Sequence, residues 1–198
     1  MRILIVGASG TIGKAIAAEL QSRHQIVTAG RSSGDLRVDI SNPQSVRELF
    51  EKAGELDAVA CAAGNVKFGP LETMTTQDYD VGLRDKLMGQ VNLVLAGRDA
   101  VKNGGSFTLI SGILAQDPIR FGSSASMVNG AIESFVRAAA IELPAQRINA
   151  VSPTVLEESL EGYGSYFRGF EAVPAKRVGM AFSKAIEGQQ TGQVYRVY

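Results

Sequence analysis

Short apolar runs alternate along the chain with longer segments in which apolar residues recur at helical spacing. Residues 2–6, RILIV, form one uninterrupted apolar run after their first residue, which is typical of a strand buried on both faces. Residues 11–23 instead place Ile12, Ile16 and Leu20 four positions apart, as on one face of a helix. The same two patterns predict strands at 25–30, 35–40, 56–64, 104–112, 147–153 and 192–198, and helices at 41–54, 76–101, 122–143 and 172–187.

This strand–helix alternation predicts an α/β protein with a Rossmann-type, doubly wound fold. We expect a seven-stranded, mostly parallel sheet with helices on both faces, formed by a single domain over residues 1–198. Local signals mark the ends of the 41–54 helix: Asn42 suits the cap, Pro43 the first turn and Gly54 the end. In such folds ligands bind at the carboxyl ends of the strands.

Composition narrows the classes of function. The 198 residues include 20 basic and 20 acidic side chains, so the formal net charge is zero. That balance gives no support for binding nucleic acid or an anionic membrane. No apolar run is long enough to span a bilayer, so we expect no membrane segment.

The N-terminal run is short and leads directly into a glycine motif, so we interpret it as a first strand and not as a signal peptide. The single Cys61 excludes an internal disulfide, and together these features predict a cytoplasmic protein. One cysteine and one histidine, His24, are too few for the usual zinc site, so we expect no metal. His24 is predicted to lie on the surface, away from the carboxyl ends of the strands.

A glycine motif follows the first strand directly. Gly7, Gly10 and Gly13 separate it from the first helix, which is the setting in which such glycines cradle a pyrophosphate. Backbone N–H groups and the helix dipole would hold the phosphates there, with Ser9, Thr11 and Ile12 beside them. The alternative interpretation is a glycine-rich turn that binds nothing.

The end of the second strand indicates which dinucleotide would bind. NAD-binding proteins usually carry an acid about twenty residues past the loop, but Gly30 stands here, followed by Arg31 and Ser32. A guanidinium beside a hydroxyl suits a 2′-phosphate, which favours NADP(H). Alternatively, Arg31 is a solvated loop cation close to Asp35.

Several stretches, in order, resemble the short-chain dehydrogenase/reductase family over nearly the whole chain. They are GASGTIG (7–13), VDIS (38–41), CAAG (61–64), AAAIEL (138–143) and RINAVSPT (147–154). The spacing of the middle glycine is similar to that of the family's extended branch, and Cys61 stands where the family usually has asparagine. The resemblance implies cofactor contacts from Asp39, Ile40, Ala63, Gly64, Pro153 and Thr154.

The family's catalytic pair is missing from this resemblance. Its tyrosine, the general acid, falls on Ala125, and its lysine falls on Asn129. An asparagine that the family carries on the preceding helix falls on Lys86, so lysine and asparagine are exchanged. The catalytic serine falls near Gly112, next to Ser111. We therefore predict a non-standard reacting end formed by Ser111, Lys86 and Asn129. The alternatives are an exposed helical cation for Lys86 and a loop-capping role for Ser111.

The segment 157–170, with its glycines and with Tyr163 and Tyr166, suits a mobile lid over a substrate, or a simple cover on the sheet. The helix at 124–143 is rich in small residues, and the resemblance implies that it and the preceding long helix form the interface of a homodimer or homotetramer. Alternatively, its small residues allow close packing on the chain's own sheet. The resemblance implies an NADP(H)-dependent oxidoreductase that acts on a small carbonyl or alcohol. The alternatives are a non-catalytic NADP(H)-binding sensor and, less favoured, a lyase or isomerase.

Overall fold

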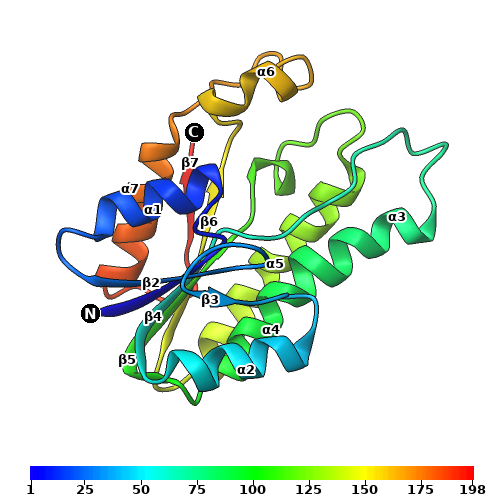
Figure 1. Ribbon diagram of the computed structural model, residues 1–198. Helices are drawn as coiled ribbons and strands as arrows, with labels where there is room; N and C mark the ends of the chain where they lie inside the picture. Colours follow the sequence, from blue (N-terminus) through cyan, green and yellow to red (C-terminus); the bar gives the residue numbers. More distant parts are fainter.

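The computed structural model describes residues 1–198 and contains one seven-stranded sheet (Figure 1). The strand order is β3-β2-β1-β4-β5-β6-β7, and every pairing is parallel, which confirms the predicted doubly wound arrangement. The strands are β1 (Arg2–Val6), β2 (Gln25–Gly30), β3 (Leu36–Arg37), β4 (Leu56–Cys61), β5 (Val101–Ile110), β6 (Arg147–Pro153) and β7 (Val194–Val197). The α-helices are α1 (Thr11–Leu20), α2 (Pro43–Ala53), α3 (Thr76–Val81), α4 (Met88–Gly97), α5 (Ser123–Glu142), α6 (Leu160–Tyr163) and α7 (Ala175–Glu187).

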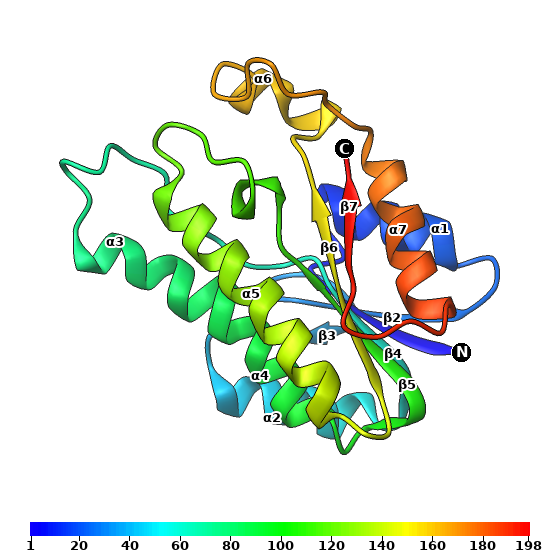
Figure 2. The same cartoon turned by 180° about the vertical axis from the view of Figure 1, so that it is seen from behind.

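The helices form one layer on each face of the sheet. α1 and α7 lie on one face, while α2, α4 and α5 lie on the other, as the two opposite views show (Figures 1 and 2). None of the helices combines the length and the apolar character that a membrane crossing requires. The sheet order reverses direction between β1 and β4, and in open parallel sheets ligands bind at such a point.

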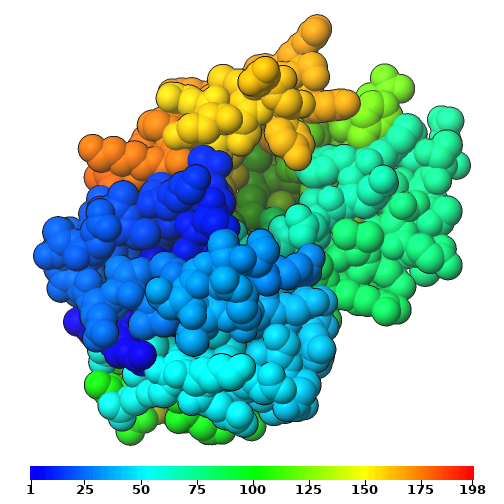
Figure 3. Space-filling model, in the orientation of Figure 1, coloured from blue at the N-terminus to red at the C-terminus, as the bar shows by residue number.

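A recess opens at the carboxyl ends of the strands. Figure 3 shows it between the N-terminal segment in blue, the segment around α6 in yellow and orange, and the chain in green. Because strand ends and the loops after them meet here, residues far apart in the sequence come together at this edge.

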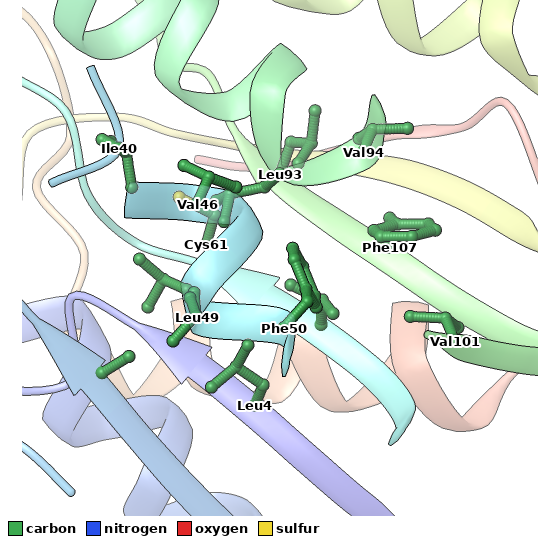
Figure 4. Close-up of a cluster of buried hydrophobic side chains, with 14 of the residues drawn as sticks. Leu4, Ile40, Val46, Leu49, Phe50, Cys61, Leu93, Val94, Val101 and Phe107 are labelled. Atoms are coloured by element: carbon green, nitrogen blue, oxygen red, sulfur yellow. The ribbon is translucent and has the colours of Figure 1, made fainter. Parts of the chain in front are cut away.

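The hydrophobic core is divided by the sheet into two clusters. Along β1, Leu4 and Val6 belong to the larger cluster under α2, α4 and α5, whereas Ile3 and Ile5 belong to the cluster under α1 and α7. Successive strand residues point to opposite faces, so an apolar run without alternation is what a doubly covered strand requires. Figure 4 shows part of the larger cluster, with side chains from β1, α2, β4, α4 and β5 in contact around Phe50.

Some predicted boundaries are wrong, and each error has a tertiary cause. The third strand has only two residues, because only Ala29 and Gly30 of β2 pair with it. β5 begins at Val101 and not at residue 104 as predicted, because Val101 pairs with Leu56 of β4. The polar and glycine residues that follow Val101 had suggested a later start. The predicted helices begin and end within a few residues of the observed ones elsewhere. At α2 the predicted cap is confirmed: Asn42 accepts hydrogen bonds from the backbone N–H groups of Gln44 and Ser45.

The segment predicted as one helix over 76–101 consists of three parts. After α3, residues Gly82–Leu87 form a π-helical turn, and α4 follows at Met88. A π-turn is wider than an α-turn, and such turns inside helices are frequent at functional sites. Hydrophobic spacing alone does not reveal such a turn. Here it carries Asp85 and Lys86 to the recess.

Candidate active site

The glycine loop between β1 and α1 has the geometry of an anion cradle. Gly7 has a φ of +85°, and a Cβ on Gly13 would lie 2.1 Å from the Gly7 carbonyl oxygen, so both positions need glycine. Gly10 caps α1 without a side chain, so no side-chain group occupies the N–H groups of the first turn. Thr11 is exposed at the start of that helix. Free N–H groups at a helix N-terminus bind phosphate readily.

A cavity of about 200 Å³ lies beside this loop, between β1, β2 and β4. It is also lined by Asn65 and Asp85, two residues that the sequence did not indicate. Asp85 accepts hydrogen bonds from the backbone N–H and the side-chain amide of Asn65, at 3.1 and 2.5 Å. Of the residues predicted to bind the cofactor, those that line it are Gly7, Ser9, Arg31, Ser32, Ile40, Ala63 and Gly64.

Arg31 is held at this cavity by two carboxylates. Its Nη2 lies 3.2 Å from Oδ1 of Asp39 and 3.7 Å from Oδ1 of Asp85. The neighbour suspected from the sequence, Asp35, instead accepts hydrogen bonds from the backbone and hydroxyl of Thr28. A hydrogen bond from the Ser41 hydroxyl, with help from Arg31, holds the pKa of Asp39 below its usual range. The guanidinium therefore lies at the cavity and contacts two acids, while its side chain stays 62% exposed to solvent.

A second cavity, of about 340 Å³, contains the predicted reacting end. Lys86 comes from the π-turn, Ser111 from the end of β5, and Asn129 from α5, so three separate elements meet there. Ala125, one helical turn before Asn129, lines the same cavity and offers no hydroxyl. Three further predicted cofactor contacts also line it: Ile12, Pro153 and Thr154.

Lys86 is not the exposed helical cation that was the alternative expectation. Its side chain is partly buried, and Nζ donates a hydrogen bond to the backbone oxygen of Ser111 at 3.2 Å. Burial lowers its pKa from 10.5 to about 8. Gly64 lies close to the Lys86 backbone: a Cβ at position 64 would be 2.7 Å from the Cα of Lys86. Gly64 also has a φ of +123°, which favours glycine. Glycine at that position lets β4 and the π-turn approach closely.

Two polar atoms of the second cavity lack a partner. Asn129 is 3% exposed, yet its Oδ1 accepts no hydrogen bond, and the Thr154 hydroxyl, also buried, makes none. Buried polar groups without partners are costly, and they are often satisfied by a ligand or water. A ribose or carboxamide of a bound dinucleotide has the hydroxyl and amide groups that these atoms could pair with.

Ser111 is hydrogen-bonded to a buried acid that the sequence did not indicate. Its hydroxyl donates to Oε1 of Glu133 at 3.0 Å, with the backbone oxygen of Val151 at 3.4 Å as a second acceptor. Glu133 is 3% exposed, and its Oε2 accepts a hydrogen bond from the Gln116 side chain at 2.6 Å. The available signal was spacing, because Ala125, Asn129 and Glu133 are four residues apart on α5.

An aromatic cavity of about 540 Å³ adjoins the second cavity, and Phe68 and Tyr163 line both. Phe68 meets Tyr163 edge to face at 6.1 Å between ring centroids, and Phe121 meets Tyr166 likewise at 6.2 Å. Tyr163 and Tyr166 are about half exposed and belong to the segment around α6 that borders the recess (Figure 3).

His24 lies far from these cavities, but it is less exposed than predicted. Its side chain is 11% exposed, and Nε2 lies 2.8 Å from the carboxylate of Glu187 on α7. The contact joins the end of the α1 segment to α7. It therefore has a structural role away from the recess.

The fold and the glycine loop together define a Rossmann-type dinucleotide-binding protein. A family model described as enoyl-(acyl carrier protein) reductase matches residues 7–189. The short-chain dehydrogenase/reductase GME11373 of Pestalotiopsis microspora is 32% identical and matches 76% of this chain and 66% of its own length. The chain belongs to the short-chain dehydrogenase/reductase family.

Other relatives support an oxidoreductase in general terms. Versicolorin reductase stcU of Emericella nidulans is 28% identical over 79% of this chain and 69% of its own length. The crystal structure of lin1944 from Listeria innocua is 48% identical, covers 100% of both chains and has a TM-score of 0.98. A small-chain dehydrogenase in complex with NADPH is 27% identical, covers 100% of this chain and 96% of its own, and has a TM-score of 0.89.

Proposed function

We propose that the protein is an NADP(H)-dependent oxidoreductase that interconverts a carbonyl and an alcohol, with its reacting end rebuilt around Lys86. One observation carries the proposal. Lys86, whose side chain is partly buried, lines one cavity next to the glycine loop together with Asn129 and Thr154, each of which has a buried polar atom without a partner. Leaving polar groups unpaired in a fold costs stability, so their convergence favours a ligand that satisfies them.

The cofactor would be held along the strand ends. The glycine loop would bind the diphosphate, and Asp39 and Ile40 would border the adenine. Arg31 and Ser32 would bind the 2′-phosphate, in exchange for the acids that Arg31 now contacts. Asn129 and Thr154 would bind the nicotinamide end. NADPH, when bound, supplies the hydride.

The chain's own residues would then supply charge and position. Ala125 cannot donate a proton, so the role of the family's tyrosine must fall elsewhere. Lys86 brings a positive charge to the same cavity from the neighbouring helix, and an ammonium there would stabilise negative charge that develops on a carbonyl oxygen.

The aromatic cavity favours a substrate with a planar, apolar substituent. Rings of Phe68, Phe121, Tyr163 and Tyr166 surround it, and two of these rings also border the reacting end. Such rings hold flat apolar groups through area burial and edge contacts. A small aromatic ketone or aldehyde fits this description.

The test is turnover of a panel of aromatic and aliphatic carbonyls, followed by loss of NADPH absorbance. We expect the Lys86→Ala variant to lose about a hundredfold or more in kcat. Lys176→Ala is the matched control, because Lys176 is exposed and lies outside the reacting cavity. Turnover by Lys86→Ala at the control's rate would refute the assignment. Arg31→Ala should weaken NADPH binding at least tenfold while leaving NADH binding unchanged.

A second candidate is a non-catalytic NADP(H)-binding sensor. It is favoured by one observation: Ala125, at the position of the family's tyrosine, has no hydroxyl. Tight NADPH binding with no turnover of any carbonyl or alcohol would support this second function.

We also propose that the protein acts in the cytoplasm as a homodimer or homotetramer. Support for assembly comes from large apolar side chains exposed on α4 and α5: Met88, Leu95, Met127 and Ile141. Exposed apolar side chains mark an interaction site where they lie together in one patch. Light scattering after size exclusion should give a mass of two or four chains, and a monomer would contradict it.

A further inference from the structure

The buried carboxylate behind the reacting end has no role in the function proposed so far. Glu133 lies on α5, two turns after Ala125, and its carboxylate is bonded on both oxygens. Burying an ionisable group is costly, and such groups are kept where they pair or perform chemistry. The side chain that connects it to the cavity is Ser111.

The direction of the Ser111 hydrogen bond determines what its hydroxyl can do. A serine hydroxyl has one proton to donate and two lone pairs. The proton lies toward Glu133 Oε1 at 3.0 Å, with Val151 O farther away at 3.4 Å. The lone pairs therefore remain for a group in the cavity, so Ser111 can accept a proton from a substrate alcohol.

We infer that Ser111 and Glu133 form a proton relay that takes the place of the hydroxyl missing at Ala125. Ser111 is the catalytic residue that touches the substrate, and Glu133 is the positioning residue that orients it and holds the proton. The inference rests on the proposed function, since it assigns the proton path of that same reaction. Lys86 anchors the other side of Ser111 through the hydrogen bond to its backbone oxygen.

The bond changes balance in both directions. In oxidation, the alcohol proton moves to Ser111 Oγ while the Ser111 proton moves to Glu133 Oε1. The hydride would leave the carbinol carbon with the electron pair of the C–H bond, the C–O bond would become C=O, and NADP⁺, when bound, would be the acceptor of the hydride. This would leave a carbonyl, the reduced cofactor and a protonated Glu133, which would then release its proton to solvent. In reduction each change is reversed, and Glu133 supplies the proton through Ser111.

Few charges surround this relay. Within α5, Arg137 lies 4.0 Å from Glu133 Oε2, and its own side chain is 56% exposed. From the π-turn, Lys86 faces the Ser111 carbonyl. From the turn after β5, the neighbour is the neutral Gln116. Arg137 therefore places a positive charge between the buried carboxylate and the surface.

The experiment compares Glu133→Gln, Ser111→Ala and the control Glu142→Gln, an exposed residue on the same helix. Glutamine keeps an acceptor for the Ser111 hydroxyl but cannot take its proton, so orientation survives and the relay does not. We expect Glu133→Gln to bind NADPH within twofold of wild type by fluorescence and to lose about a hundredfold in kcat. In the direction of alcohol oxidation, where Glu133 takes up the proton, Glu133→Gln should also lose the acidic limb of the pH–rate profile, which Glu142→Gln retains.

Each outcome decides the matter. Wild-type kcat and pH profile in Glu133→Gln would overturn the relay and leave the carboxylate a structural group. If Glu133→Gln does not fold, Ser111→Ala is the deciding variant. A kcat and a pH–rate profile equal to those of wild type in Ser111→Ala would also overturn the relay. Wild-type protein that turns over no carbonyl or alcohol would overturn the proposed function, and the relay with it. Wild-type turnover together with active variants would overturn the relay alone.

Discussion

Replacing Lys86 with methionine tests whether the ammonium is kept for function at the expense of stability. Methionine has a similar length and an apolar chain, so it can fill the space against Gly64 and under Ser111. Burial lowers the Lys86 pKa from 10.5 to about 8. Since a pKa difference of one corresponds to about 1.4 kcal/mol, the charged side chain costs the folded state up to about 3 kcal/mol at neutral pH.

The sign of the pH dependence follows from proton binding. Between about pH 8 and 10.5 the unfolded chain, with its ordinary lysine, binds more protons than the folded chain. Wild-type stability therefore rises with pH across this window, and the full cost of the ammonium is present below it. Lys86→Met has no such group, so its advantage should shrink to about 1 kcal/mol near pH 9.5.

The assay is urea unfolding of the cofactor-free protein at both pH values, with Lys176→Met as an exposed control. We expect Lys86→Met to unfold at higher urea than wild type at neutral pH, and Lys176→Met to stay within about 0.5 kcal/mol of it. The variant should at the same time lose activity. A variant less stable than wild type at neutral pH, or a gap that does not narrow as pH rises, would refute the reasoning.

Two further predictions concern the glycine loop and a distant ion-pair cluster. In Gly13→Ala the new Cβ would meet the Gly7 carbonyl oxygen at 2.1 Å, and a backbone atom cannot move aside cheaply. A strain of about 1–3 kcal/mol at the cradle should weaken NADPH binding about tenfold or more in a fluorescence titration, and an unchanged Kd would contradict this. Glu187 has its pKa lowered from 4.5 to about 2, chiefly by the hydrogen bond from Arg23. The stability that Glu187 contributes is therefore present above pH 4.5 and is lost as the pH falls toward 2. In thermal unfolding, Glu187→Gln should lower the free energy of unfolding by about 1 kcal/mol at neutral pH and leave it unchanged near pH 2. A difference between variant and wild type that does not change with pH would argue against this role.

Much of the fold could be predicted because its signals are local. The buried strands appear as apolar runs, and the sheet arrangement follows from their alternation with helices. The cap at Asn42 needs only its own neighbours, Gln44 and Ser45. The errors in the predicted strand boundaries occur where pairing with a neighbouring strand decides where a strand begins or ends. β5 begins at Val101 because Leu56 lies beside it, and no pattern within residues 101–105 indicates this.

The reacting end could be predicted only in part. The resemblance pointed to Lys86 and Asn129 as an exchanged pair, and both line one cavity. It did not reveal Glu133, because a glutamate in the middle of a helix is usually solvated. It did not reveal Asp85 either, whose partners Arg31 and Asn65 come from other loops.

The sequence alone determined the periodic elements, the sheet they build and the glycines of the anion cradle, because these depend on residues close together along the chain. Only the tertiary structure decided the burial of Lys86, the pairing of Arg31 with two acids and the bond between Ser111 and Glu133. The last pair is separated by 22 residues. Charge state, burial and hydrogen-bond direction are set by neighbours in space, and parallel strands with helical crossovers bring such neighbours together from distant parts of the chain.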